Sequence, residues 1–120
     1  MSQDSVQFTI AQGDTSVLVR LHHARITQID EVESLNRALD PIVAGLDNAQ
    51  FHFDFQDVQY ITSGIIGWLA AMALRIKGKG GVVHLYHLTP EMDQLLRQVG
   101  MHKQMTLHPQ QEPPPSLESI

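Results

Sequence analysis

The alternation of strand-like and helix-like apolar patterns in the second half of the chain constrains the fold most strongly. "FHFDF" (Phe51 to Phe55) places a phenylalanine at every second position, which is the period of a β-strand. The stretch from Ile65 to Ile76 is apolar over a helical length, and "VVHLY" (Val82 to Tyr86) is a second compact strand. Strand–helix–strand alternation implies right-handed crossovers and a parallel or mixed sheet with helices packed on it.

The first half of the chain adds a hairpin and one helix. "VQFTI" (Val6 to Ile10) and "SVLVRL" (Ser16 to Leu21) flank the turn signal "AQGD", which predicts an antiparallel pair and therefore a mixed sheet. Apolar residues then recur at helical spacing over residues 32–46. Because an interior proline removes a backbone donor, we expect a kink or short break near Asp40–Pro41.

The last elements are a short helix and a possible final strand. "TPEMDQLLRQVG" has Thr89 as N-cap, Pro90 in the first turn and Gly100 at its end. "MTL" (105–107) completes the α/β order β-β-α-β-α-β-α-(β). Residues 108–120 are rich in proline and lack apolar periodicity, so we expect one domain over residues 1–107 followed by a disordered tail.

Composition excludes several classes of function. A chain of 120 residues suits one domain, and a net charge of −5 without a basic run argues against nucleic acid as a partner. The absence of cysteine excludes disulfides, Cys-ligated zinc and thiol nucleophiles, and it fits a reducing compartment. The longest apolar stretch, Ile65 to Leu74, is too short to span a bilayer, and the N-terminus does not resemble a signal peptide. We therefore expect a cytoplasmic protein without membrane insertion.

Two groups of polar residues suggest chemistry only weakly. His84 and His87 have a metal-like spacing, but a strand would point them to opposite faces, so we expect no metal site. Asp54 and Asp57 flank the end of a strand and could bind a cation or exchange protons. Without a third partner in view, Asp54 is better interpreted as an acceptor of hydrogen bonds from a neighbouring loop, and Asp57 as the start of a turn.

Ser63 lies in "YITSGIIGWLAAM", where a strand ends and a helix begins. One interpretation is an N-cap, whose side chain satisfies an N–H group of the following helix. A second is a hydrolase nucleophile, but the Gly-x-Ser-x-Gly elbow lacks its first glycine here. A third is phosphorylation, which would add about two negative charges at a helix N-terminus that favours anions.

Several motifs together resemble one family. They are, in order, "DFQDVQYITSGIIGWL", "GKGG", "VVHLYHL", "TPEMDQLLRQVG" and "MHKQM". In this order and spacing they are similar to STAS domains, specifically the single-domain anti-sigma factor antagonists of the SpoIIAA type. The resemblance covers roughly residues 6–107 and implies the STAS fold.

The resemblance also implies site residues. Ser63 falls on the serine that a partner kinase phosphorylates in the family. Thr62 falls on a position that is usually aspartate and is a possible second site. Gly64 takes the place of the following small residue, Gly67 that of the helix glycine that lets the partner approach, and Thr27 an acidic position of the family's partner-binding segment.

Trp68 lies off the buried stripe of the same helix, one turn after Gly64. It would either anchor a partner beside Ser63 or pack under the first helix or a loop.

The implied function is partner switching by a non-enzymatic protein without a cofactor. With unmodified Ser63 the protein would bind an anti-sigma factor or a related histidine-kinase-like serine kinase, and phosphorylation of Ser63 would release it. A metal-dependent serine phosphatase would then remove the phosphate. The alternative is a STAS subunit of a larger assembly, such as a lipid ABC transporter or a stressosome-like scaffold.

Overall fold

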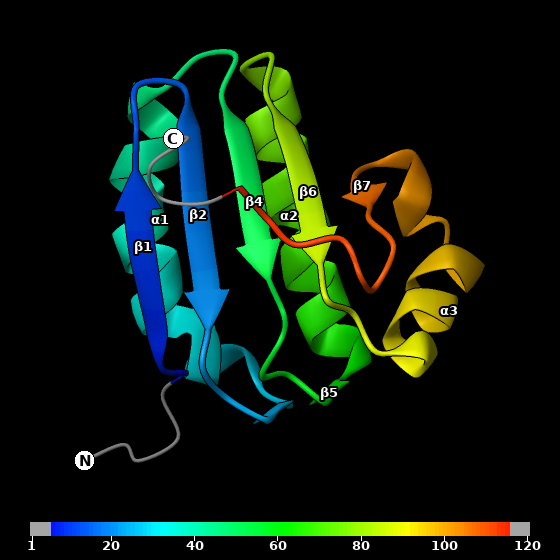
Figure 1. Ribbon diagram of the computed structural model, residues 1–120. Coiled ribbons are helices and arrows are strands. Elements are labelled where there is room, and N and C mark those ends of the chain that lie inside the picture. Colours follow the sequence, from blue (N-terminus) through cyan, green and yellow to red (C-terminus); the bar gives the residue numbers. More distant parts are fainter. Residues whose placement is uncertain (1–5, 116–120) are drawn as a thin grey trace.

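A computed structural model describes residues 6–115, which form a five-stranded sheet in the order β1-β2-β4-β6-β7 (Figure 1). The strands are β1 (Phe8–Gln12), β2 (Ser16–Leu21), β4 (Gln50–Asp54), β6 (Val82–Tyr86) and β7 (Thr106–Leu107). β1 pairs antiparallel with β2, and every other pairing in this sheet is parallel. The sheet is therefore mixed, as the hairpin predicted.

Helices cover one face of the sheet and leave the other face open to the C-terminal part of the chain. The longer helices α1 (Glu33–Gly45) and α2 (Ser63–Gly78) lie behind the sheet, and α3 (Pro90–Gln98) lies beside its β6–β7 edge (Figure 1). Two 3-10 turns, η1 (Ile29–Val32) and η2 (Met101–Lys103), precede α1 and follow α3.

The core lies between the sheet and the two long helices. The alternation in β4 sends Phe51 and Phe53 to this side, where each is at most 1% exposed. Leu39 of α1 and Leu69 of α2 meet them from the helix layer, and both are buried. Burial of these large side chains supplies most of the free energy that holds the two layers together.

The sequence-based elements are confirmed in type and order, with two short strands added. β3 (Arg25–Ile26) and β5 (Tyr60–Ile61) pair in parallel as a separate two-stranded sheet. Strands of two residues are too short to show a period in the sequence, so β3 was not predicted, and of β5 only a strand end before Ser63 was expected.

Of the kink or short break expected near Asp40–Pro41, the break is wrong, because α1 runs continuously through Pro41, and the kink stays a prediction. Pro41 is exposed, so its ring and the carbonyl that loses a hydrogen bond lie on the solvent side of the helix. Leu39 and Val43 on either side of it are buried against the core. Packing on the inner face therefore holds the helix together where its outer face lacks one hydrogen bond.

The segment after β7 contacts the sheet where the structure describes it. Residues 108–115 pass in front of β6 towards β4 (Figure 1), and the backbone N–H of His108 donates to the Leu85 carbonyl at 3.0 Å. The remaining residues of the expected tail, 116–120, lie outside the described range. The division into a domain over 1–107 and a disordered tail stays a prediction. Among the described helices, none is both long and apolar enough to cross a membrane.

Candidate functional site

Ser63 is the first residue of α2, and it is exposed. The N–H groups of Ile65 and Ile66 both donate to the Thr62 carbonyl at 3.1 Å, which are the first hydrogen bonds of the helix. The N–H groups of Ser63 and Gly64 therefore occupy the first-turn positions that a helix leaves without an intrahelical partner. An anion attached to Ser63 would lie at these N–H groups and at the positive end of the helix dipole.

The expectation that Ser63 caps this helix is wrong, because Thr62 occupies the N-cap position. Thr62 has an extended backbone, which continues from the pairing of β5 with β3. Its hydroxyl makes no capping bond and instead donates to the Thr27 carbonyl at 2.8 Å. Thr62, at the family's aspartate position, thus links the start of α2 to the connection after β3. Ser63, the next residue, is exposed to solvent.

We expect Thr62→Val to destabilise the protein by about 1 kcal/mol, because the Thr27 carbonyl is part-buried and loses its donor. Valine keeps the shape of the side chain, so the change isolates the hydroxyl. Urea unfolding followed by circular dichroism measures the difference. Thr62→Ser is the matched control and should stay close to wild type; an unchanged midpoint for Thr62→Val would show that this bond contributes nothing.

The connection between β3 and α1 is held by Glu31. Its carboxylate accepts from the backbone N–H groups of Thr27 and Gln28, both at 2.8 Å, and from the Thr27 hydroxyl at 3.2 Å. Burial raises the pKa of Glu31, but these hydrogen bonds and the nearby His23 lower it more, so the pKa lies below its ordinary value. The ionised Glu31 carboxylate thus holds Thr27 in place beside Thr62, and both Glu31 and Thr27 belong to the connection between β3 and α1. Thr27 is the residue that the resemblance places at an acidic position.

Three exposed side chains around Ser63 were not identified from the sequence. Ile29 in the turn before α1 is 55% exposed and Tyr60 of β5 is 44% exposed, although both are large and apolar. The Arg25 guanidinium lies 4.6 Å from the centre of the Tyr60 ring. The pairing of β3 with β5 brings these residues to the end of the domain where α2 begins. Of the residues near the start of α2 that the sequence analysis missed, only Glu31 had a recognisable motif, because Gln28 and Glu31 have capping-box spacing.

The exposed side of α2 next to Ser63 carries two glycines. Gly64 and Gly67 are exposed, and a Cβ built on Gly67 would meet no other atom within 4 Å. Trp68 is half-buried, and its indole N–H donates to the Asn36 side chain of α1 at 3.1 Å. This contact corresponds to the packing interpretation of Trp68. Its contribution to partner binding stays a prediction, as do those of the other site residues.

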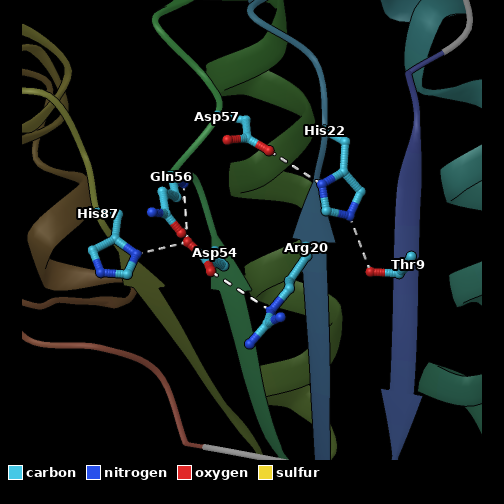
Figure 2. A network of polar contacts seen from close by, with 7 residues as sticks. All are labelled: Thr9, Arg20, His22, Asp54, Gln56, Asp57 and His87. Atoms are coloured by element: carbon cyan, nitrogen blue, oxygen red, sulfur yellow. Dashed lines mark hydrogen bonds and ion pairs between the residues drawn. The ribbon is translucent and has the colours of Figure 1, made fainter.

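A polar network holds the connection between β4 and β5, which leads to Ser63 (Figure 2). Asp54 accepts from the His87 ring at 2.8 Å and from the Gln56 backbone N–H at 2.9 Å, and Arg20 lies 3.8 Å away. Asp57 binds the His22 ring at 3.2 Å, which links the same connection to β2. The interpretation of Asp54 as an acceptor of loop hydrogen bonds is confirmed.

His84 and His87 have different partners, as their strand positions predicted. His84 contacts Gln50 and His108 on the open face of the sheet, whereas His87 binds Asp54 at the strand end. Within residues 6–115, no three His, Cys, Asp or Glu side chains are grouped so that they could hold a metal ion.

Comparison with known proteins identifies the family. A family model described as "Mlab, STAS domain" matches residues 11–109, which is most of the chain. The chain belongs to the STAS family. No curated protein matches this STAS domain significantly by sequence.

Solved structures agree with this STAS assignment at the level of the fold. An anti-sigma factor antagonist from Mycobacterium paratuberculosis superposes with a TM-score of 0.68 at 21% identity, covering 90% of this chain and 89% of that one. A STAS protein from Planctomyces limnophilus gives 0.68 at 16% identity, with 92% and 93% covered. The phosphorylated form of the Bacillus cell fate determinant SpoIIAA gives 0.65 at 15% identity, with 86% and 92% covered.

Proposed function

We propose that this STAS domain is an anti-sigma factor antagonist that works by partner switching and is not itself an enzyme. With Ser63 unmodified, the surface around the start of α2 binds an anti-sigma factor or a related histidine-kinase-like serine kinase. The kinase phosphorylates Ser63 and the complex dissociates; a metal-dependent serine phosphatase resets the protein. The observation that carries the proposal is the exposed Ser63 at the first position of α2.

The surroundings of Ser63 support a protein partner. Ile29 and Tyr60 expose apolar surface, and the glycines at 64 and 67 let another chain approach the helix closely. A phosphate on Ser63 would bring about two negative charges into the centre of such an interface. Unless the partner pairs that charge, its desolvation opposes binding strongly, so phosphorylation separates the two proteins.

A second candidate is a subunit of a larger assembly, such as a lipid ABC transporter or a stressosome-like scaffold. It is favoured by the description of the matching family model, which names Mlab and not the antagonists. In that case Thr62 and Ser63 would contact a fixed partner without modification.

Affinity capture from the source cells distinguishes the two candidates, with wild-type protein and Ser63→Glu as matched baits. The first candidate predicts a serine kinase bound to wild type and absent from Ser63→Glu, together with phosphate on Ser63 in the cellular protein. A transporter ATPase bound to the wild-type bait, with unmodified Ser63 in cells, would support the second candidate and contradict the first.

We expect Gly67→Ala to weaken binding of the serine kinase partner about tenfold while stabilising the domain by about 0.5–1 kcal/mol. The new methyl group meets nothing within the domain, so it costs no packing, and alanine favours the helix. Thermal unfolding and titration calorimetry measure the two effects. Gly45→Ala is the matched control, because Gly45 ends α1, is exposed and also has open space at its Cβ; equal affinities for the two variants would place the interface elsewhere.

A further inference from the structure

The open face of the sheet carries a cluster of rings that the proposed function does not use. The register pairs His52 of β4 with His84 of β6, and Tyr86 follows two positions later on the same face. The His52 and His84 rings stack with centres 4.8 Å apart. His108, just after β7, stacks on Tyr86 at 4.3 Å with the ring planes 8° apart. Two strands, β4 and β6, and the segment that follows β7 thus converge on one cluster.

A chain of hydrogen bonds runs from the sheet through this cluster to the C-terminal segment. His84 Nε2 lies 2.6 Å from Gln50 Oε1, and His84 Nδ1 lies 2.9 Å from His108 Nε2. His108 Nδ1 lies 2.9 Å from the Glu112 carboxylate. We define residues 108–115 as the strap, because they cross the open face in front of β6 and contact it through these side chains (Figure 1).

Donor and acceptor rules fix where the protons lie in this chain. An amide oxygen only accepts, so Gln50 Oε1 receives the proton on His84 Nε2. In neutral His84, Nδ1 is then an acceptor, and it receives the proton on His108 Nε2. His108 Nδ1 lies against the Glu112 carboxylate, which holds the ring in this orientation. Protonating His84 would put two N–H groups face to face and replace this hydrogen bond by repulsion.

The strap covers the cluster. Tyr86 is 3% exposed and His52 is 7% exposed, although both lie on the face that the helices do not cover. The His108 ring lies on Tyr86, and the strap backbone is bound to Leu85 at 3.0 Å. The His84–His108 bond is thus one of the contacts that keep the strap over the Tyr86 ring, and its loss would weaken this cover.

The pKa shifts of His52 and His84 agree with this arrangement of protons, because both favour the neutral rings. Burial, followed by the charge of His108, lowers the pKa of His84, while Glu112 raises it in part. Burial and the two neighbouring histidines lower the pKa of His52 from 6.5 to about 4. At these two rings the docked state therefore binds fewer protons than a state with the strap released. Their contribution to docking is present above the ordinary histidine pKa and is lost as the pH falls below it.

Other ionisable side chains on the same face of the sheet are Tyr86, Arg20 and Asp54. Burial and Glu112 raise the pKa of Tyr86, which is therefore neutral throughout this range. The next charged groups on the same face are Arg20 and Asp54, which lie 3.8 Å apart and face each other.

We propose that the strap is a pH-sensitive cover of the open sheet face, docked at neutral pH through His84, His108 and Glu112 and released in mildly acidic solution. Release exposes Tyr86 and His52 as a surface for other contacts. The device lies on a different face of the sheet from the helices, so it does not depend on the function proposed for Ser63.

Hydroxyl-radical footprinting of the whole protein at pH about 7.5 and about 5.5 tests the proposal. The chain has two tyrosines, and exposed Tyr60 serves as the internal reference for Tyr86. For each proton taken up, the docking constant falls by up to about tenfold per pH unit, so labelling of Tyr86 relative to Tyr60 should rise severalfold. An unchanged ratio between the two pH values would overturn the proposal.

Two variants assign the response to His84. His84→Gln removes the ring that bonds to His108 and keeps an amide that can donate and accept, so the rise in the labelling ratio at low pH should become clearly smaller than in wild type. His102→Gln removes an exposed histidine of η2 and should keep the wild-type response. Heteronuclear NOE values of the strap amides give a second readout. They should fall at the lower pH in wild type and in His102→Gln, and fall less in His84→Gln. A full response in His84→Gln would overturn the proposal.

Discussion

Replacing Ser63 with glutamate is expected to weaken binding of the kinase partner by about 100-fold or more, whereas alanine changes the affinity by less than about threefold. The glutamate carboxylate lies at an exposed helix start that the partner would cover. Truncation or charge mismatch at a buried charged contact costs about 2–5 kcal/mol, and each 1.4 kcal/mol is a factor of ten in affinity. Alanine removes a hydroxyl without adding charge, so the surface keeps its shape.

Ser63→Gln is the control for this pair of variants, because it has the size of glutamate without the charge. We expect it to bind within about tenfold of wild type when measured by titration calorimetry. The fold should tolerate all three changes, since Ser63 is exposed and a carboxylate in the first turn favours the helix dipole. Equal affinities for Ser63→Ala and Ser63→Glu would contradict the switch, and equal loss in Ser63→Gln and Ser63→Glu would point to size and not charge.

Gly81→Ala is expected to destabilise the domain by about 2–3 kcal/mol. A Cβ at this position would lie 2.5 Å from the Ala49 carbonyl oxygen and 2.8 Å from a methyl group of Ile76. The Gly81 backbone itself bonds to the Ile76 carbonyl at 2.9 Å, so it cannot move away without breaking the end of α2. Here the turn between α2 and β6 passes directly against the start of β4.

Urea unfolding of Gly81→Ala and Gly78→Ala measures this effect with a matched control. Gly78 is the last residue of α2, and a Cβ there would meet nothing within 4 Å. We expect the control to be as stable as wild type or slightly more stable. If both variants unfolded at the wild-type midpoint, the close approach at Gly81 would be refuted.

The order of elements was predictable because the dominant patterns are local. β6 has the predicted bounds of Val82 to Tyr86, and Thr89 caps α3 with a bond from the Met92 N–H at 3.1 Å. The alternation in "FHFDF" placed the phenylalanines on the core side. A break at Pro41 was expected from the missing backbone donor alone, although the apolar spacing of Leu39 and Val43 already places Pro41 on the outer side of the helix.

The candidate site was predictable only in part, because its contacts join distant segments. Thr62 and Thr27 are 35 residues apart, and the strands that bring them together are two residues long. The sequence therefore assigned the cap to Ser63 instead of Thr62. Likewise, Ile29 and Tyr60 look like core residues in the sequence, and their exposure becomes visible only in the folded structure.

The open-face cluster left a signal in the sequence that was not used. His52 and His84 each alternate with apolar neighbours in their strands, so each lies on the face opposite the core. Their proximity depends on the register of β4 against β6, which the sequence does not give. His108 lies in a segment without apolar periodicity, and its position over Tyr86 is a purely tertiary feature.

The most direct test of the proposed function is site-resolved phosphorylation by the bound kinase. Wild-type protein is incubated with the captured kinase and ATP, and the phosphate is located by tandem mass spectrometry before and after size-exclusion chromatography. The proposal predicts phosphate on Ser63, none in Ser63→Ala, and phosphorylated protein that elutes apart from the kinase. Ser63 left unmodified in the presence of active kinase, or phosphorylated protein that still elutes with it, would contradict the proposal.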